Sequence, residues 1–251
     1  MSIARLEIFI QRAAKIKNWL IAVLTGMVLQ SGYVYANANA VLPKTIEPIS
    51  LYGKEILFDV YREDSKAGFH RVKFTKMGER LGVESNFQLK INFIFFTAFQ
   101  YDYQSTATWA NGKLRRLNAT IDDDGELFSV LAVRKSDLFQ LNGPDGIVSV
   151  DAPLYPTNHW NPAVVEQARV LNTLTGKINN VQIKAQSKET VLTENGTIEA
   201  TRYAYSGDLK NEVWYDDAGR WVKMRFKARD GSTINYVCRR CQGPSDSQVP
   251  K

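Results

Sequence analysis

Apolar and polar residues alternate along most of the chain after residue 50, in short segments that end at turn sequences roughly every ten residues. Alternation with a period of two is typical of strands that bury one face, and helical periodicity is nearly absent. In the segment 55–62, Ile56, Phe58 and Val60 fall on one face, and the segment 68–76 repeats the pattern. The pattern predicts roughly ten to twelve strands, a number at which an open sheet curls or closes.

Turn sequences that contain glycine separate these segments. They are Asn111-Gly112 and the segments 122–125, 143–146, 194–196, 216–219 and 229–231. Glycine adopts the positive φ that tight hairpin turns need, and Asn and Asp tolerate it. Strands joined by such short turns are antiparallel. We therefore expect an all-β fold with one short helix, in which consecutive hairpins build a strongly curved antiparallel sheet or an open half-barrel.

One predicted strand, 91–109, begins with apolar residues on both faces and then alternates. A strand that is apolar on both faces needs cover on both faces. One interpretation is core packing on one face and a loop or helix on the other. The alternative is that the segment lines a cavity for an apolar ligand. Under this alternative the candidate ligand-binding residues are Phe93, Phe95, Phe96, Phe99, Tyr101 and Tyr103.

The loop 155–165, with the sequence YPTNHWNPAVV, interrupts the strand pattern. Asn161 can cap a helix and Pro162 suits its first position, so the predicted helix is short and lies within 161–170. Trp160 is expected to anchor the loop in the core, which would make the loop a structural hinge. Loops also carry function more often than cores do, so three loop residues join the candidate ligand-binding residues. They are Asn158, His159 and Trp160.

The first 40 residues have the pattern of a cleavable secretory signal. Basic residues precede an uncharged, mostly apolar segment at 19–29, and small residues offer cleavage sites near Ala38 or Ala40. An uncleaved N-terminal anchor is the alternative. The mature chain contains no comparable apolar segment, so we expect a periplasmic or secreted protein without a transmembrane segment. The expected parts are a signal peptide (1–40), an extended arm (41–50), a single antiparallel β domain (51–241) and a flexible tail (242–251).

The charge pattern argues against nucleic-acid binding. The full chain has a net charge of +6, and its first 40 residues hold four basic residues and one acid, which leaves +3 on the mature chain. The mature charges are interspersed, without the block of lysine and arginine that a nucleic-acid site normally shows.

Few residues in the chain suit catalysis or metal binding. The two histidines, His70 and His159, lie among apolar or aromatic neighbours. The sequence contains no Gly-x-Ser-x-Gly elbow, no His-Glu-x-x-His motif and no glycine-rich phosphate loop. The acidic turn 122–126 lacks the alternating spacing of a calcium loop. We therefore predict no catalytic residue, no cofactor and no metal site.

The two cysteines, Cys238 and Cys241, are three residues apart. Three residues of extended chain span about 10 Å, whereas the Cα atoms of a disulfide lie within roughly 7 Å. Either the chain turns at Arg239-Arg240 and the cysteines are bridged, or both stay reduced. An exported protein favours the bridge. A zinc site would need two further ligands, and the only ready candidates are the two histidines.

Several segments together resemble a family of exported bacterial proteins that carries only a domain-of-unknown-function label. The resemblance covers roughly residues 56–237, and its most specific parts are the loop YPTNHWNPAVV (155–165) and the segment WYDDAGRWVKMRF (214–226). It supplies no catalytic residue. It implies strongly curved antiparallel sheets similar to those of periplasmic lipoprotein-carrier domains, which hold acyl chains in a half-barrel. Function does not follow from such a likeness of fold.

Three hypotheses for the function follow. The first is an exported binding or carrier protein that holds an apolar ligand such as a lipid or acyl chain. The second is an envelope scaffold or assembly protein that binds a protein partner and no small ligand. The third is an enzyme that uses the loop 155–165, with His159 as base and Asn158 or Asn161 orienting the substrate. It requires an exposed His159 beside a pocket and close to Asp151 or His70.

Overall fold

The structure is a computed structural model and describes residue 42 and residues 46–93 and 96–243. The predicted signal peptide and nearly all of the predicted tail lie outside these residues. Among the described residues, fourteen antiparallel strands form one sheet. The first eight are β1 (Glu55–Arg62), β2 (Ser65–Met77), β3 (Arg80–Phe93), β4 (Phe96–Ala110), β5 (Lys113–Asp123), β6 (Glu126–Lys135), β7 (Leu138–Gly143) and β8 (Gly146–Asp151). The other six are β9 (Arg169–Leu171), β10 (Ile178–Thr193), β11 (Gly196–Gly207), β12 (Asn211–Asp216), β13 (Trp221–Lys227) and β14 (Thr233–Arg240).

Each predicted glycine turn joins two consecutive strands of this sheet. In the turn between β4 and β5, Asn111 and Gly112 have φ angles of 52° and 67°. Two consecutive positive φ angles are the geometry that matches the twist of a tight hairpin. The predicted all-β fold of consecutive hairpins is therefore confirmed, although the strands are more numerous than the predicted ten to twelve.

The sheet starts and ends at strands that are distant in the chain. Its order is β8-β7-β6-β5-β4-β3-β2-β1-β14-β13-β12-β11-β10-β9. The chain thus builds one half outward from β1 to β8, crosses to β9 at the opposite edge, and returns until β14 pairs with β1. The edge strands β8 and β9 are not paired with each other, so the sheet is not closed.

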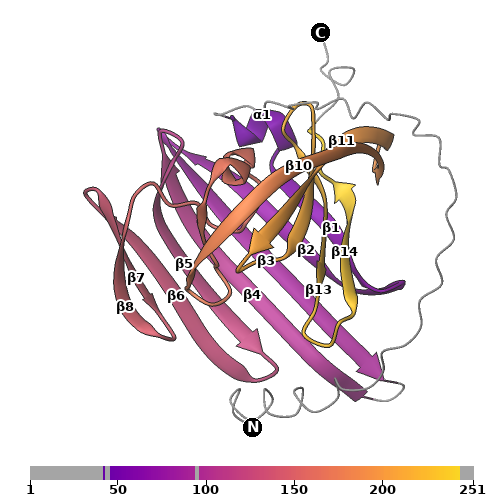
Figure 1. The fold of residues 1–251 in the computed structure, drawn as a ribbon, viewed down its shortest axis with the longest axis horizontal. Coiled ribbons are helices and arrows are strands. Elements are labelled where there is room, and N and C mark those ends of the chain that lie inside the picture. Colours follow the sequence, from indigo (N-terminus) through magenta and orange to yellow (C-terminus); the bar gives the residue numbers. More distant parts are fainter. Residues whose placement is uncertain (1–41, 43–45, 94–95, 244–251) are drawn as a thin grey trace, which may run out of the picture. The chain divides into compact units, whose positions relative to one another are not determined.

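The sheet is strongly curved, as predicted. In Figure 1, β10, β11, β13 and β14 are drawn in front of the layer formed by β2 to β6. Arg229, in the turn between β13 and β14, forms an ion pair of 2.5 Å with Asp123 at the end of β5, although four strands lie between β5 and β14 in the sheet order. Lys177, before β10, pairs with Asp145, between β7 and β8, at 3.2 Å. These contacts place the two halves around a common core.

The predicted strand 91–109 is instead a hairpin. β3 ends at Phe93 and β4 begins at Phe96, which pairs with Phe93. The prediction of one strand with two apolar faces is therefore wrong, because the apolar residues belong to the ends of two neighbouring strands. The alternation further along β4 is confirmed, since Tyr103, Ala107 and Trp109 are buried on one face.

Two helices differ from the predictions. Helix α1 (Pro48–Tyr52) begins within 41–50, where we expected an extended arm, and Pro48 occupies its first turn, where proline is tolerated. The predicted helix within 161–170 is a 3₁₀ helix over Pro162–Glu166 only, since β9 begins at Arg169. Its predicted cap is correct: the Asn161 side-chain oxygen accepts a hydrogen bond of 3.1 Å from the Ala163 N–H.

The loop that joins the two edge strands runs through the core. We call residues 152–168 the plug loop. Asn158, His159 and Trp160 are buried in it, which confirms Trp160 as an anchor. The loop also pairs in parallel with β9: the Thr157 N–H donates to the Leu171 carbonyl at 3.0 Å, and the Leu171 N–H donates to the Tyr155 carbonyl at 2.8 Å. The plug loop therefore fills space that the open sheet leaves between its halves.

Replacing Trp160 with alanine is expected to lower the free energy of unfolding by about 3–5 kcal/mol, because it removes a buried indole and leaves a cavity. Urea titration of the variant and the parent protein measures the difference. Leu127→Ala is the control, because the Leu127 side chain is 78% exposed. The control should stay within about 0.5 kcal/mol of the parent protein. An equally small loss for Trp160→Ala would contradict the role of Trp160 as a core anchor.

Candidate functional site

A row of four aromatic rings lies at the rim of the sheet where β2 and β4 end. Tyr52 of α1 stacks on Phe74 of β2, with ring centroids 5.8 Å apart. Phe74 contacts Trp160 of the plug loop at 5.5 Å, and Trp160 contacts Trp109 of β4 at 5.1 Å. Each of the four side chains is almost fully buried. We call these four residues the aromatic row.

Tyr52 ties α1 to the plug loop and to β13. Its hydroxyl accepts a hydrogen bond of 2.8 Å from the Trp221 N–H and donates one of 3.0 Å to the Trp160 carbonyl. Burial raises the pKa of Tyr52 well above its ordinary value of 10.0, so the hydroxyl stays neutral and remains a donor. Helix α1 is therefore held in place by its last residue, Tyr52, which is also the first ring of the aromatic row.

A cavity of about 390 Å³ lies at the tryptophan end of the row. Its volume falls in the range of small-molecule sites. We call it the tryptophan cavity, because Trp109 and Trp160 both line it. Its other apolar lining residues are Ile46, Pro48, Ile49, Leu81 and Ala110. Its charged lining residues are Glu47, Lys76, Glu79 and Arg80.

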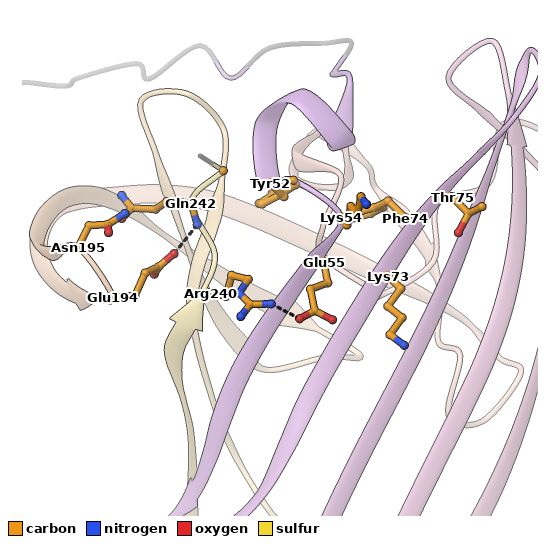
Figure 2. Close-up of a pocket in the computed structure, with 12 residues that line it drawn as sticks. Tyr52, Lys54, Glu55, Lys73, Phe74, Thr75, Glu194, Asn195, Arg240 and Gln242 are labelled. Atoms are coloured by element: carbon orange, nitrogen blue, oxygen red, sulfur yellow. Dashed lines mark hydrogen bonds and ion pairs between the residues drawn. The ribbon is translucent and has the colours of Figure 1, made fainter. Parts of the chain in front are cut away.

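A second cavity of about 700 Å³ lies at the tyrosine end of the row, where Tyr52 and Phe74 line it. We call it the lysine cavity after Lys54 and Lys73, which belong to its wall. Figure 2 shows its side chains arriving from β1, β2, β14 and the turn between β10 and β11. Because Tyr52 and Phe74 line this cavity and Trp160 lines the other, the aromatic row connects the two.

The disulfide helps to build the wall of the lysine cavity. Cys238 and Cys241 are bonded, with Cα atoms 5.8 Å apart, which is the bridged alternative of the two that we considered. The chain turns there, and the Glu194 carboxylate accepts hydrogen bonds from the N–H groups of Cys241 (2.9 Å) and Gln242 (3.0 Å). The Gly243 N–H then donates to the Leu51 carbonyl of α1 at 3.1 Å. The bridged turn thus connects β14 to α1.

The structure distributes the predicted ligand-binding residues over several places. Trp160 lines the tryptophan cavity, whereas Tyr103 and Asn158 meet in the core, where the Tyr103 hydroxyl donates to the Asn158 side-chain oxygen at 3.2 Å. Phe99 and Tyr101 are half-buried further along β4 and line neither of the two cavities. Phe93 and Phe96 lie in β3 and β4 by their backbone, and the prediction for Phe95 falls outside the described residues. The predicted residues therefore do not form one site.

Both histidines are buried and pack against Trp221. The ring centroids of His70 and His159 lie 5.5 Å and 5.7 Å from that of Trp221. His70 Nε2 lies 2.8 Å from the Ser85 hydroxyl, and His159 Nδ1 lies 3.4 Å from the Tyr205 hydroxyl. Within the described chain, His70 Nδ1 and His159 Nε2 have no hydrogen-bond partner. Burial lowers the pKa of each histidine from 6.5 to about 3, so both are neutral at pH 7.

This geometry does not meet the requirements of the enzyme hypothesis. The His159 side chain is only 2% exposed and lines neither cavity. Asp151, a proposed partner, is exposed and lies 3.9 Å from Arg169 in an ion pair. His70 lies near His159 but is buried as well. Burial is the main cause of the lowered pKa of both rings, and the neighbouring His159 lowers the pKa of His70 further. A general base must reach its substrate, and His159 is covered.

Sequence reasoning missed most of the residues that line the two cavities. Phe74 lies in the predicted strand 68–76, but no pattern indicated that Tyr52 would stack on it. Lys54 and Lys73 are isolated lysines in the sequence and have no motif around them. A pairing of β1 and β2 counted from the turn between them would have placed Glu55 opposite Val72, because an irregularity between Val60 and Tyr61 shifts the register and brings Lys73 opposite Glu55.

Comparison with known proteins gives a family. The family model described as "Domain of unknown function (DUF6134)" matches residues 58–239. The chain belongs to this family. Its description names no activity, so it assigns no role to the aromatic row or to either cavity. The predicted resemblance to a β-rich family with a domain-of-unknown-function label is thereby confirmed, while export stays a prediction.

One solved structure extends the comparison of folds. It is described as a β-barrel-like protein of domain of unknown function DUF1849 from Brucella abortus. It has 11% sequence identity to this chain and a TM-score of 0.55, and the match covers 76% of this chain and 97% of that one. At this identity the similarity shows the fold alone. A comparison with curated proteins found no match. None of the helices in the described part of the chain has the length and apolar character needed to cross a membrane.

The buried histidines predict a loss of stability in mild acid. The unfolded chain binds protons at His70 and His159 near pH 6.5, whereas the folded protein binds them only near pH 3. Between these values the unfolded state binds more protons, so stability falls as the pH falls. From pH 8 to pH 5 we expect a loss of about 2 kcal/mol per histidine. Urea titrations at both pH values measure this loss.

The variants His70→Gln and His159→Gln should each remove about half of this pH dependence, whatever they do to stability at pH 8. The carboxylates whose pKa values the fold lowers, Glu212 and Asp230, begin to lose their stabilising effect only below their ordinary values of 4.5 and 3.8. They therefore contribute little between pH 8 and pH 5. An unchanged pH dependence in both variants would show that the histidines are not the responsible groups.

Proposed function

We propose that this protein is an exported binding or carrier protein that holds an apolar ligand, such as a lipid or acyl chain, at the aromatic row. The observation that carries the proposal is the row itself: four aromatic side chains in consecutive contact connect two cavities at one rim of the sheet. Aromatic rings supply large apolar surfaces of fixed shape. Such a row suits a long apolar chain better than it suits a compact polar ligand.

The tryptophan cavity supplies the entrance for such a chain. It combines the faces of Trp109 and Trp160 with the aliphatic side chains of Ile49 and Leu81. Each methylene group moved from water into an apolar site contributes about 0.8 kcal/mol. Each methylene group that enters this cavity therefore strengthens binding, even before any part of the ligand reaches the rest of the row.

Helix α1 is the element that would yield to a longer ligand. It is five residues long, too short to be stable without its contacts to the rest of the protein. Its contacts in the structure centre on Tyr52 and on the bond between Leu51 and Gly243. A ligand that lies along the row would replace the packing of α1 with its own apolar surface.

Export is the second part of the proposal. It is supported by the basic residues, apolar segment and small residues at the N-terminus, in the order of a secretory signal. The disulfide between Cys238 and Cys241 agrees with an oxidising compartment such as the periplasm. N-terminal sequencing of the protein from a fractionated cell tests this part, and a start near residue 39 or 41 in the periplasmic fraction is expected.

Ligand binding is tested with the protein expressed from its full sequence and delipidated. We expect saturable quenching of tryptophan fluorescence by an acyl probe, because Trp109 and Trp160 line the cavity. Leu81→Trp fills the tryptophan cavity from its half-buried wall and should weaken binding by about tenfold or more, which corresponds to 1.4 kcal/mol. Leu127→Trp, at an exposed position on β6, is the matched control and should bind normally.

Two results would contradict the binding proposal. One is the absence of saturable binding for acyl probes of every length tested. The other is equal affinity in Leu81→Trp and Leu127→Trp, provided that both variants melt at the temperature of the parent protein. Native mass spectrometry of the protein from its own envelope, followed by organic extraction, identifies the natural ligand.

A scaffold function is the second candidate, and the edge strand β8 favours it. Ile147 is 65% exposed and Val148 is 49% exposed, in a strand whose outer backbone groups have no partner strand among the described residues. Exposed apolar edge strands can pair with an extended segment of another protein. Val148→Lys should abolish capture of such an envelope partner in a cross-linking experiment while leaving acyl binding unchanged.

A further inference from the structure

We propose that the lysine cavity binds an anionic head group, a phosphate or a carboxylate, of the amphiphile whose apolar part lies on the aromatic row. The inference rests on the proposed function and names the chemical class of its ligand. It depends on which charges of the cavity are already paired, and on the two aromatic residues that the cavity shares with the row.

The two lysines of the cavity are the cations that remain available. The side chains of Lys54 and Lys73 are exposed, and neither forms an ion pair or a hydrogen bond within the described chain. Lys73 lies on β2 opposite Glu55, the first residue of β1, and Lys54 directly precedes β1, where its carbonyl accepts a hydrogen bond of 2.9 Å from the Phe74 N–H. An ammonium group in such a position supplies a point charge with several donors for phosphate or carboxylate oxygens.

The two carboxylates of the cavity are already occupied. Glu55 forms an ion pair with Arg240, as Figure 2 shows, and lies 3.8 Å from Arg71 on its other side. Glu194 accepts the N–H groups of Cys241 and Gln242 at the bridged turn. Arg240 therefore neutralises the Glu55 carboxylate, and backbone N–H groups hold the Glu194 carboxylate. Neither carboxylate is paired with Lys54 or Lys73, so both lysines stay available to an incoming anion.

The same cavity reaches the apolar site. Tyr52 and Phe74 line it, and their stacked rings are the first pair of the aromatic row. A ligand with its charged group between Lys54 and Lys73 can therefore continue with its apolar part along the row toward Trp160. The arrangement places a polar site and an apolar site on either side of one stacked pair, which is the arrangement that an amphiphile requires.

Head-group preference is measured with probes that share one chain. Binding of dodecyl phosphate, dodecanoate and the uncharged dodecyl maltoside is compared by calorimetry below the concentration at which each forms micelles. We expect the two anions to bind about tenfold more tightly than the uncharged probe, since hydrogen bonds to charged groups contribute about 1.5–3 kcal/mol. Raising the ionic strength should weaken the binding of the anions only, because the lysines are exposed.

Matched variants assign the effect to the two lysines. The double variant Lys54→Gln/Lys73→Gln should bind both anions only as well as it binds dodecyl maltoside, whose own affinity should not change. Lys135→Gln/Lys210→Gln removes the same charge at exposed positions outside both cavities and should bind like the parent protein. Because the side chains of Lys54 and Lys73 form no ion pair or hydrogen bond within the described chain, their replacement should leave the melting temperature unchanged.

Four outcomes overturn the inference, and they differ in what they say of the proposed function. Equal affinity for charged and uncharged probes, or normal anion binding by the Lys54/Lys73 variant, refutes the head-group site and leaves the carrier proposal intact. Inorganic phosphate that binds as tightly as dodecyl phosphate would identify a site for a free anion instead of a lipid head group. Failure of all three dodecyl probes to bind refutes both proposals.

Discussion

An antiparallel sheet that curves strongly without closing must have its interior filled and its two edges accommodated. In this protein one segment meets both needs, because the plug loop leaves β8 at one edge, passes through the core and enters β9 at the other. Its parallel pairing with Leu171 fixes its path, and Trp160 fixes its depth. The aromatic row exists only because the plug loop brings Trp160 between Phe74 and Trp109.

The same packing explains why the core contains polar groups that remain neutral. His70, His159 and the tyrosine hydroxyls lie where the curved sheet and the plug loop meet, and hydrogen bonds to Ser85, Tyr205 and main-chain carbonyls hold several of them. Burial penalises every charged form, which keeps the histidines unprotonated at pH 7. These groups therefore serve the packing of the plug loop. The charged side chains that could contact a ligand line the two cavities at the rim, beside α1.

The sequence predicted local structure well wherever a residue type dictates it. Each glycine turn was found because glycine, asparagine and aspartate are the residues that tolerate positive φ, and Asn161 capped a helix as expected. The hairpin between β3 and β4 was missed because neither glycine, proline nor asparagine stands between Phe93 and Phe96. Helix α1 was missed because five residues are too few for a periodic pattern to emerge, and the proline that begins it also suits an extended chain.

The candidate site escaped prediction for a different reason: its residues come from segments that are far apart in the sequence. Tyr52 and Trp160 are separated by 108 positions in the sequence, yet the Tyr52 hydroxyl donates a hydrogen bond to the Trp160 carbonyl. Such a contact is set by the sheet order, which pairs β14 with β1 and turns the plug loop inward, and no local pattern encodes that order. The individual strands can be predicted from the sequence. The aromatic row and its two cavities depend instead on the path of the plug loop between the two unpaired edges of the curved sheet.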